Sequence, residues 1–307
     1  MDLAIEGPIG LAETRSQVAL EAPKRWFRSL RRFCGRQILC DLLLSPYGHL
    51  AHRRVLRASR RNQAHIYTRF YRSPCQIEAL LSHVIPFIDQ GKVPRKLSIN
   101  ILACSTGAEA YTVASEVMAG CPGLEFSICA SDLHEETVAR GQAARYTLAE
   151  VFQNADIPDR FLERTFERMG EDFVIKPEVR AKVSFTRADL LDPFLATRFE
   201  PADIVFAQNV FFHLPPDDAI TAFDNVVKLL KSRSALFIDG MELDMKERLT
   251  AQADLAPLGY KCRQIHTHAR KEVPAQWWRY YYGVEPYPVL RAGRLRRYST
   301  IFLRNEA

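Results

Sequence analysis

From residue 97 onward, short apolar runs alternate with segments whose apolar positions recur every three or four residues. Strand-length runs that alternate with helical patterns are typical of βαβ units, which build a parallel sheet. We therefore predict an α/β fold for this part of the chain. The predicted strands span residues 97–104, 125–131, 183–188, 203–208 and 235–239. The predicted helices span residues 107–120, 135–143, 158–168, 216–231 and 244–256.

The N-terminal part of the chain has a helical pattern throughout. Periodicity predicts helices at 24–44, 49–64 and 75–90, whereas residues 1–22 are weakly patterned. We predict a flexible tail at 1–22 and an N-terminal helical region at 23–92.

The C-terminal part ends differently. Residues 260–268 and 296–303 predict a final antiparallel pair of strands, and an aromatic insertion at 271–295 lies between them. The tryptophans and tyrosines of this insertion either pack the extension onto the sheet or cap a pocket over a hydrophobic substrate. We predict one main domain at 93–307 that carries the insertion.

Composition places the chain among ordinary globular proteins. Of its 307 residues, 47% are hydrophobic and 25% are charged, which excludes a wholly disordered or fibrous chain. No apolar stretch approaches the roughly 20 residues of a membrane helix, and the first residues do not have the pattern of a secretory signal. We therefore expect a cytoplasmic protein with no membrane span.

The net charge of +6 is concentrated near the N-terminus. Between Lys24 and Arg61 there are eleven lysines and arginines against one acidic residue, Asp41. Their spacing predicts basic helical faces, which either attract acidic partners or are solvated surface. A nucleic-acid partner is unlikely, because this stretch has no clear platform on which bases could stack.

No metal site is predicted. The seven cysteines are an odd number, and no two have the spacing of a zinc knuckle or a redox dithiol. His266 and His268 would point the same way on the predicted strand 260–268, but no carboxylate or thiol stands nearby at ligand spacing.

Candidate chemistry follows the predicted strands. In an open parallel sheet, ligands bind where the strands end at their carboxyl edge, next to the point where strand order reverses. The first strand runs into a turn of small residues at 103–107, which lets a ligand approach the backbone and the free N–H groups of the next helix. Asp132 ends the second strand, where a carboxylate can accept both hydroxyls of a ribose.

The small-residue turn narrows the class of ligand. It has a single glycine, Gly107, rather than the three-glycine fingerprint that packs a pyrophosphate, so a dinucleotide is disfavoured. A terminal antiparallel pair is also typical of methyltransferase sheets. Residues 189–190 and 209–213 follow the next two predicted strands. Candidate site residues therefore stand at four strand ends.

Five motifs in order resemble the CheR family, the chemotaxis-receptor protein-glutamate O-methyltransferases. The resembling segments are TRFYR at 68–72 for T-x-F-F-R, CSTGAEAY at 104–111 for CSTGEEPY, ASD at 130–132 for A-T-D, DLL at 189–191 for N-L-L, and QNVFFH at 208–213 for R-N-V-x-I-Y. The resemblance covers about residues 64–242 and implies a class I Rossmann-like fold. That fold has a seven-stranded mixed sheet with a terminal antiparallel pair, here preceded by a small N-terminal helical extension.

The resemblance also implies the cofactor and the site. The cofactor would be S-adenosyl-L-methionine, with Asp132 on the ribose, Asp189 and Leu190 near the adenine, and Asn209 by the methionine portion. The other implied cofactor-binding residues are Thr68, Arg72, Cys104, Thr106, Gly107 and Glu109. Arg72 and His213 match the two family positions that face the transferring methyl group, so they are the predicted catalytic residues.

The sequence departs from the family pattern at positions that would select the methyl acceptor. His213 replaces a tyrosine, and it either accepts a proton near neutral pH or only lines the pocket. Ala108 and Ala110 replace a glutamate and a proline, and Asp189 replaces an asparagine. Residues 170–185 are too few to predict the small β-subdomain on which the family docks receptors.

These departures favour carboxyl O-methylation of a small acid or a peptide of specialised metabolism, with an acidic or aromatic acceptor. The first alternative is a chemoreceptor protein-glutamate O-methyltransferase. The second alternative, which the missing tyrosine prompts, is a non-catalytic regulator that binds S-adenosylmethionine.

Overall fold

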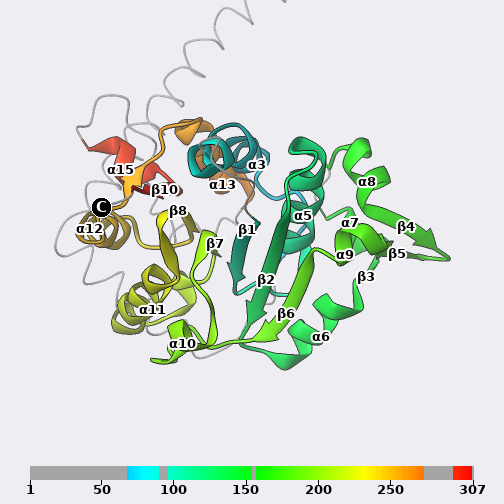
Figure 1. Ribbon diagram of the computed structural model, residues 1–307, viewed down its shortest axis with the longest axis horizontal. Coiled ribbons are helices and arrows are strands. Elements are labelled where there is room, and N and C mark those ends of the chain that lie inside the picture. The colour runs from blue at the N-terminus through cyan, green and yellow to red at the C-terminus, as the bar shows by residue number, and fades with distance from the viewer. Residues whose placement is uncertain (1–67, 90–95, 154–156, 273–292, 306–307) are drawn as a thin grey trace, which may run out of the picture.

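The main body of the protein is a seven-stranded sheet with helices on both faces (Figure 1). The computed structural model describes residues 68–89, 96–153, 157–272 and 293–305. The strand order is β6-β2-β1-β7-β8-β10-β9. The strands are β1 (Leu97–Leu102), β2 (Phe126–Asp132), β6 (Val183–Arg187), β7 (Ala202–Gln208), β8 (Leu230–Asp239), β9 (Ala256–Pro257) and β10 (Ile301–Arg304).

Five of these strands run parallel, as the alternation of patterns predicts. β6, β2, β1, β7 and β8 pair in parallel, whereas β10 pairs antiparallel with both β8 and β9. The predicted mixed sheet with terminal antiparallel strands is therefore confirmed. Strand order reverses between β1 and β7, so the carboxyl ends of these two strands flank the expected ligand crevice.

Both faces of the sheet are buried in separate hydrophobic cores. Along β7, Ile204 and Phe206 face one core, while Val205 and Ala207 face the other. Burial on both faces explains why residues 204–207 of β7 are a continuous apolar run in the sequence. The helices beside the first core include α3 (Pro74–Ala79), α4 (Ile85–Asp89), α5 (Ala108–Gly120) and α8 (Asp159–Thr165). The helices beside the second core include α10 (Leu195–Arg198), α11 (Pro216–Lys228) and α12 (Leu243–Gln252).

The predicted helix at 75–90 is confirmed, with one irregularity. A π-helical turn, η1 (Leu80–Val84), joins α3 to α4, and the N–H of Ile85 donates to the carbonyl of Leu80. Pro86 follows directly and has no N–H to donate. A wider turn at this point keeps the helix continuous past the proline.

The predicted strand at 260–268 is wrong, because this segment forms the helix α13 (Cys262–Glu272). Cys262, Ile265 and His266 are buried, which is the three-and-four spacing of a helix face. His266 and His268 therefore do not share a strand face. In the predicted strand 296–303, the first part belongs to helix α15 (Arg294–Tyr298), and β10 begins only at Ile301.

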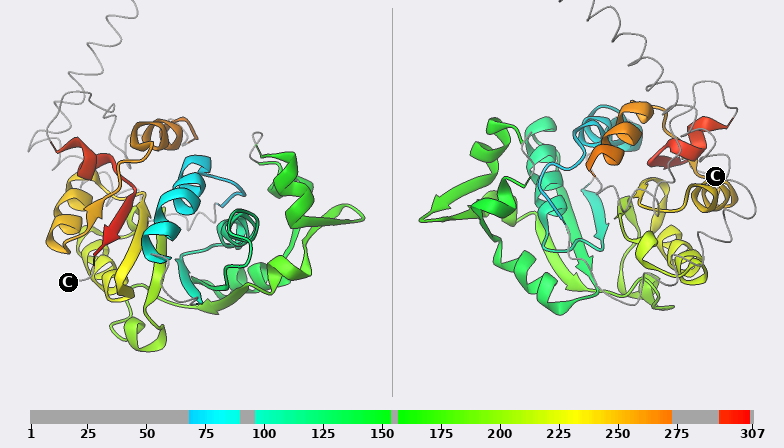
Figure 2. Two further views of the ribbon diagram at one scale, coloured as in Figure 1. Left: turned by 45° about the horizontal axis from the view of Figure 1, so that its top comes forward. Right: turned by 180° about the vertical axis from the view of Figure 1, so that it is seen from behind.

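A second, three-stranded antiparallel sheet contradicts the expectation that the chain is too short for a β-subdomain. Its order is β3-β5-β4, from β3 (Arg145–Thr147), β4 (Phe166–Met169) and β5 (Asp172–Ile175). This sheet begins at Arg145, upstream of residues 170–185. Its strand β4 includes the last residues of the segment 158–168, which was predicted to be a helix. The β4–β5 hairpin projects sideways from the main sheet (Figure 2).

The remaining elements connect these layers. They are α6 (Glu135–Ala143), α7 (Leu148–Val151), α9 (Pro177–Arg180) and the 3-10 turn η2 (Phe211–His213).

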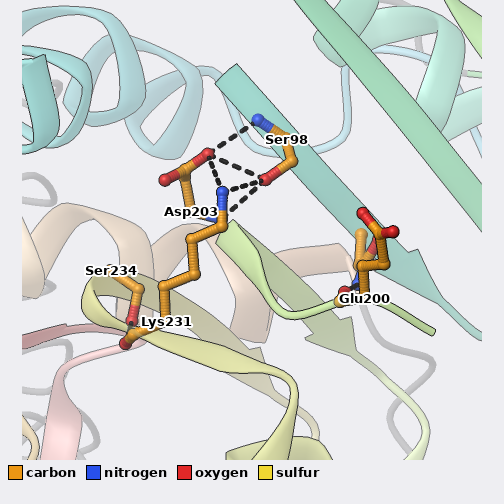
Figure 3. Close-up of polar contacts among 6 residues, drawn as sticks. Ser98, Glu200, Asp203, Lys231 and Ser234 are labelled. Atoms are coloured by element: carbon orange, nitrogen blue, oxygen red, sulfur yellow. Dashed lines mark hydrogen bonds and ion pairs between the residues drawn. The ribbon is translucent and has the colours of Figure 1, made fainter. Parts of the chain in front are cut away.

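A buried ion pair fastens the amino-terminal edge of the main sheet (Figure 3). One carboxylate oxygen of Asp203, which is fully buried, accepts from the N–H of Ser98 at 2.8 Å, from its hydroxyl at 2.8 Å, and from Lys231 Nζ at 2.9 Å. These three residues belong to or adjoin β1, β7 and β8. The cluster therefore ties the central strands together at the end opposite the ligand crevice.

Several predictions lie outside the described residues. They are the tail at 1–22, the helices at 24–44 and 49–64, and most of the aromatic insertion at 271–295. Among the helices that the structure describes, none is long and apolar enough to cross a membrane.

Candidate functional site

The turn between β1 and α5 has an unusual backbone. Ala103, Ser105 and Gly107 have φ values of 54°, 51° and 89°, all in the left-handed region. Such a conformation costs a non-glycine residue about 1–2 kcal/mol, so other contacts must hold it. A side chain at Gly107 would also come within 2.8 Å of the Phe185 ring, which explains why a glycine stands there.

Three hydrogen bonds from neighbouring strands hold this turn. The N–H of Cys104 donates to the carbonyl of Ser131 at 2.9 Å, and the N–H of Ser105 donates to Asp132 Oδ2 at 2.8 Å. From β3, the Tyr146 hydroxyl donates to the carbonyl of Thr106 at 2.6 Å. The turn is thus fixed on one side by β2 and on the other by the three-stranded sheet.

The carboxylate of Asp132 is oriented before any ligand binds. Its second oxygen, Oδ1, accepts from the N–H of His134 at 3.1 Å and from Thr137 Oγ1 at 2.9 Å, at the start of α6. Each carboxylate oxygen has two lone pairs, so acceptor capacity remains for a ligand hydroxyl. Ser105 Oγ is buried close by and has no hydrogen-bond partner among the described residues.

Arg72 and Asn209 come together from distant parts of the sequence. Arg72 Nη2 donates to Asn209 Oδ1 at 3.1 Å. Asn209 has a left-handed φ of 56°, and its N–H donates to the carbonyl of Asp239 at 2.9 Å. Tyr71, which precedes the arginine, is also left-handed, and its N–H donates to Thr112 Oγ1 at 3.1 Å. Arg72 is thereby directed toward the carboxyl end of β7.

Glu109 lies in the first turn of α5 and is partly buried. Burial is the main cause that raises the pKa of its carboxyl group to about 7; the Arg72 guanidinium opposes this shift, and the nearby Asp239 adds to it. The carboxyl group is therefore divided between its neutral and ionised forms near neutral pH. Glu109 thus interacts with the guanidinium of Arg72 and with the carboxyl group of Asp239, at the end of β8.

Cys104 is a buried thiol within the turn. It is 2% exposed, and burial strongly raises the pKa of its thiol, as do the carboxylates of Asp132 and Glu109. The thiol therefore stays neutral and does not act as a nucleophile.

Four further predicted site residues differ in how deeply they are buried. Asp189 is exposed, and its carboxylate accepts from the N–H of Leu191 at 2.9 Å, whereas Leu190 is buried. Thr68 is half-buried. His213 is exposed, and its ring lies 4.1 Å from that of Phe212.

Sequence reasoning missed Asp239, Tyr146 and Phe185. Asp239 ends β8. The rule that selected residues at the ends of the other parallel strands also applies to it. Tyr146 and Phe185 had no signal in the sequence, because each acts on the turn from a strand more than thirty residues away. No group of three potential metal ligands occurs in the part of the chain that the structure describes.

The residues present fit S-adenosylmethionine. This cofactor brings two ribose hydroxyls, an ammonium group and a sulfonium, which call for carboxylates. Asp132 stands at the end of β2, and Glu109 lies beside the turn. The carboxylate of the methionine portion calls for donors such as the first N–H groups of α5. The fold and the site together define a class I Rossmann-like S-adenosylmethionine-dependent methyltransferase.

Comparison with known proteins identifies the family. Residues 67–254 match the family described as CheR methyltransferase, SAM binding domain. The chain belongs to this family, its cofactor is S-adenosylmethionine, and the resemblance inferred from the five motifs is confirmed.

Three relatives show how the match is distributed. An uncharacterized 104.1 kDa protein in the hypE 3' region of Rhodobacter capsulatus is 32% identical over 70% of this chain and 22% of its own length. A probable biofilm formation methyltransferase WspC of Pseudomonas putida is 31% identical over 62% of this chain and 44% of its own. A chemotaxis protein methyltransferase of Listeria monocytogenes is 25% identical over 56% and 63%, respectively. The matched part thus spans less than half of the first two relatives.

Proposed function

We propose that the chain transfers a methyl group from S-adenosylmethionine to a carboxylate, namely a glutamyl side chain of a protein acceptor. The observation that carries this proposal is the Arg72 guanidinium, which Asn209 holds by a 3.1 Å hydrogen bond at the carboxyl end of β7. A guanidinium can hold a carboxylate bidentately, so a cation at this point favours an anionic acceptor.

The chemistry asks little of the protein beyond positioning. When bound, S-adenosylmethionine supplies an electrophilic methyl group on its sulfonium. A carboxylate is ionised at pH 7 and is already a nucleophile, so no strong base is needed. Arg72 would orient the acceptor oxygen, and His213, which is exposed, would contact the acceptor rather than remove a proton from it.

The cofactor-binding roles follow the strand ends. In this proposal Asp132 accepts from a ribose hydroxyl, Glu109 faces the positive charge of the methionine portion, and Asn209 borders that portion. Asp189 and Leu190 flank the adenine. The remaining residues proposed to line the cofactor site are Thr68, Arg72, Cys104, Thr106 and Gly107.

The three-stranded sheet supports a protein acceptor over a small one. The sequence favoured a small acid or a peptide of specialised metabolism, because no β-subdomain for receptor docking was expected. The structure has a three-stranded sheet of β3, β4 and β5 beside the site. Two of the relatives are named as methyltransferases of chemotaxis and biofilm formation. A small-acid acceptor gains no comparable support.

The test is a methylation assay with the full chain and labelled S-adenosylmethionine. The acceptors would be the cytoplasmic domain of a chemoreceptor, the same domain with its glutamates changed to glutamine, and a panel of small carboxylic acids. Arg72→Lys serves as the matched variant, because it keeps the charge and loses the planar fork.

A glutamyl methyl ester is recognised by methanol release in base. We expect base-labile label on the receptor domain, none on its glutamine form, and turnover at least tenfold lower in Arg72→Lys. Label that resists base, or transfer to small acids alone, would refute the proposal. Tight cofactor binding without turnover on any acceptor would instead favour the non-catalytic regulator.

A further inference from the structure

Tyr146 connects the two sheets at the cofactor turn. It lies in β3, is 1% exposed, and directs its hydroxyl into the main domain, where it donates to the carbonyl of Thr106 at 2.6 Å. Burial raises the pKa of this phenol well above its usual value, so the hydroxyl remains a donor throughout the physiological range. The bond joins an element outside the Rossmann-like sheet to the turn between β1 and α5.

The turn needs such a contact because its backbone is strained. Ser105 and Gly107, on either side of Thr106, are both left-handed, with φ values of 51° and 89°. A strained conformation persists only when its surroundings determine it fully. The Asp132 carboxylate holds the N–H of Ser105, and Tyr146 holds the carbonyl one residue later.

The same tyrosine also contacts the segment that carries Arg72. The Phe70 ring meets the Tyr146 ring edge-to-face, with centroids 4.8 Å apart, and it meets Phe166 of β4 at 5.0 Å. Phe70 is 1% exposed and lies two residues before Arg72. The three-stranded sheet therefore packs against the arginine segment and bonds to the cofactor turn through one side chain.

We propose that Tyr146 is a positioning residue, which holds the turn at Ser105–Gly107 in the conformation that binds S-adenosylmethionine and thereby couples the three-stranded sheet to the cofactor site. By linkage, the coupling is reciprocal: a partner that orders this sheet tightens cofactor binding, and the cofactor orders the sheet. The inference concerns cofactor binding in the absence of an acceptor. It therefore stands or falls separately from the acceptor proposed above.

The chain offers a matched control in Tyr111. This tyrosine is also fully buried, and its hydroxyl donates to a backbone carbonyl at 2.8 Å, but that carbonyl belongs to Gly141 in α6 rather than to the turn. Its ring lies 6.4 Å from that of Tyr146. Tyr146→Phe and Tyr111→Phe remove the same kind of bond from the same aromatic cluster, and a purely structural role would affect both alike.

The experiment measures the affinity for S-adenosylhomocysteine by calorimetry, together with the thermal unfolding midpoint of each variant. We expect similar falls in the midpoint, about tenfold weaker binding in Tyr146→Phe, and less than threefold weaker binding in Tyr111→Phe. Equal losses of affinity in the two variants, or unchanged affinity in Tyr146→Phe, would overturn the proposal.

Hydrogen exchange of the unmodified chain provides a second measurement if Tyr146→Phe does not fold. Adding S-adenosylhomocysteine should slow amide exchange in residues 145–147 and 172–175 of the three-stranded sheet, as well as in residues 103–107. Slower exchange in the turn alone would show that the sheet is not coupled to the cofactor, and the proposal would be wrong.

Discussion

The carboxyl group of Glu109 predicts how cofactor binding depends on pH. In the free chain burial raises the pKa of this group to about 7 from an ordinary 4.5. Because the folded pKa is raised, the folded state holds its proton more tightly than the unfolded state. The resulting stability is fully present below pH 4.5 and is lost as the pH rises through 7. A gap of about 2.5 units corresponds to as much as about 3 kcal/mol.

Cofactor binding should reverse this shift. The cofactor brings an ammonium group and a sulfonium, and positive charge near a carboxyl group favours its ionised form. If Glu109 is ionised in the complex, binding releases a proton, and affinity rises with pH until the group is already ionised in the free chain. For a free pKa of about 7, affinity should be about tenfold higher at pH 8 than at pH 6.

Calorimetry in buffers of different ionisation enthalpy measures both quantities, the affinity and the protons released. Glu109→Gln should bind S-adenosylmethionine with nearly constant affinity from pH 6 to 8, and this variant should be more stable than the unmodified chain at pH 8. Glu136→Gln, which changes an exposed carboxylate of α6, should behave like the unmodified chain. Affinity that is flat across this range in the unmodified chain would refute the reasoning.

Three further substitutions test the framework of the site. Asp203→Asn should lower the free energy of unfolding by about 3 kcal/mol in urea denaturation, because it disrupts a buried ion pair. Burial alone would raise the pKa of Asp203, but Ser98 and Lys231 outweigh it and lower that pKa, so this stability should be lost in acid below about pH 4. Asp132→Asn should weaken S-adenosylhomocysteine binding by about 1–3 kcal/mol in calorimetry; unchanged affinity would exclude Asp132 from the ribose site. Gly107→Ala should lower the thermal midpoint and weaken cofactor binding, because its side chain would meet Phe185.

The main sheet could be predicted because its strands carry their own signal. β7 and the second half of β8 are buried on both faces, so residues 204–207 and 235–238 are continuous apolar runs in the sequence. The helix α13 was predicted to be a strand because most of its residues are polar. Its buried face is formed by Cys262, Ile265 and His266, and only two of these are apolar. The three-stranded sheet was not predicted, because β3, β4 and β5 have only three or four residues each. Runs this short carry too little periodicity to predict.

The proposed cofactor half of the site could be derived from the sequence for a different reason. Its residues follow directly after strands, and the fold brings all strand ends to one edge, so Asp132 and Asn209 could be placed without knowing any contact. Tyr146 could not, because it acts through tertiary packing. The same holds for the bond between Arg72 and Asn209, whose residues are 137 positions apart.

Asp239 adds a charge that the motifs do not contain. In the free chain Glu109 interacts with Asp239 and with the Arg72 guanidinium, and the raised pKa of Glu109 means that a proton offsets part of the negative charge. S-adenosylmethionine would bring a net positive charge, and the proton that Glu109 gives up would offset it. We therefore predict that cofactor binding leaves the net charge around Arg72 nearly unchanged, so that Arg72 can still receive the acceptor carboxylate in the complex.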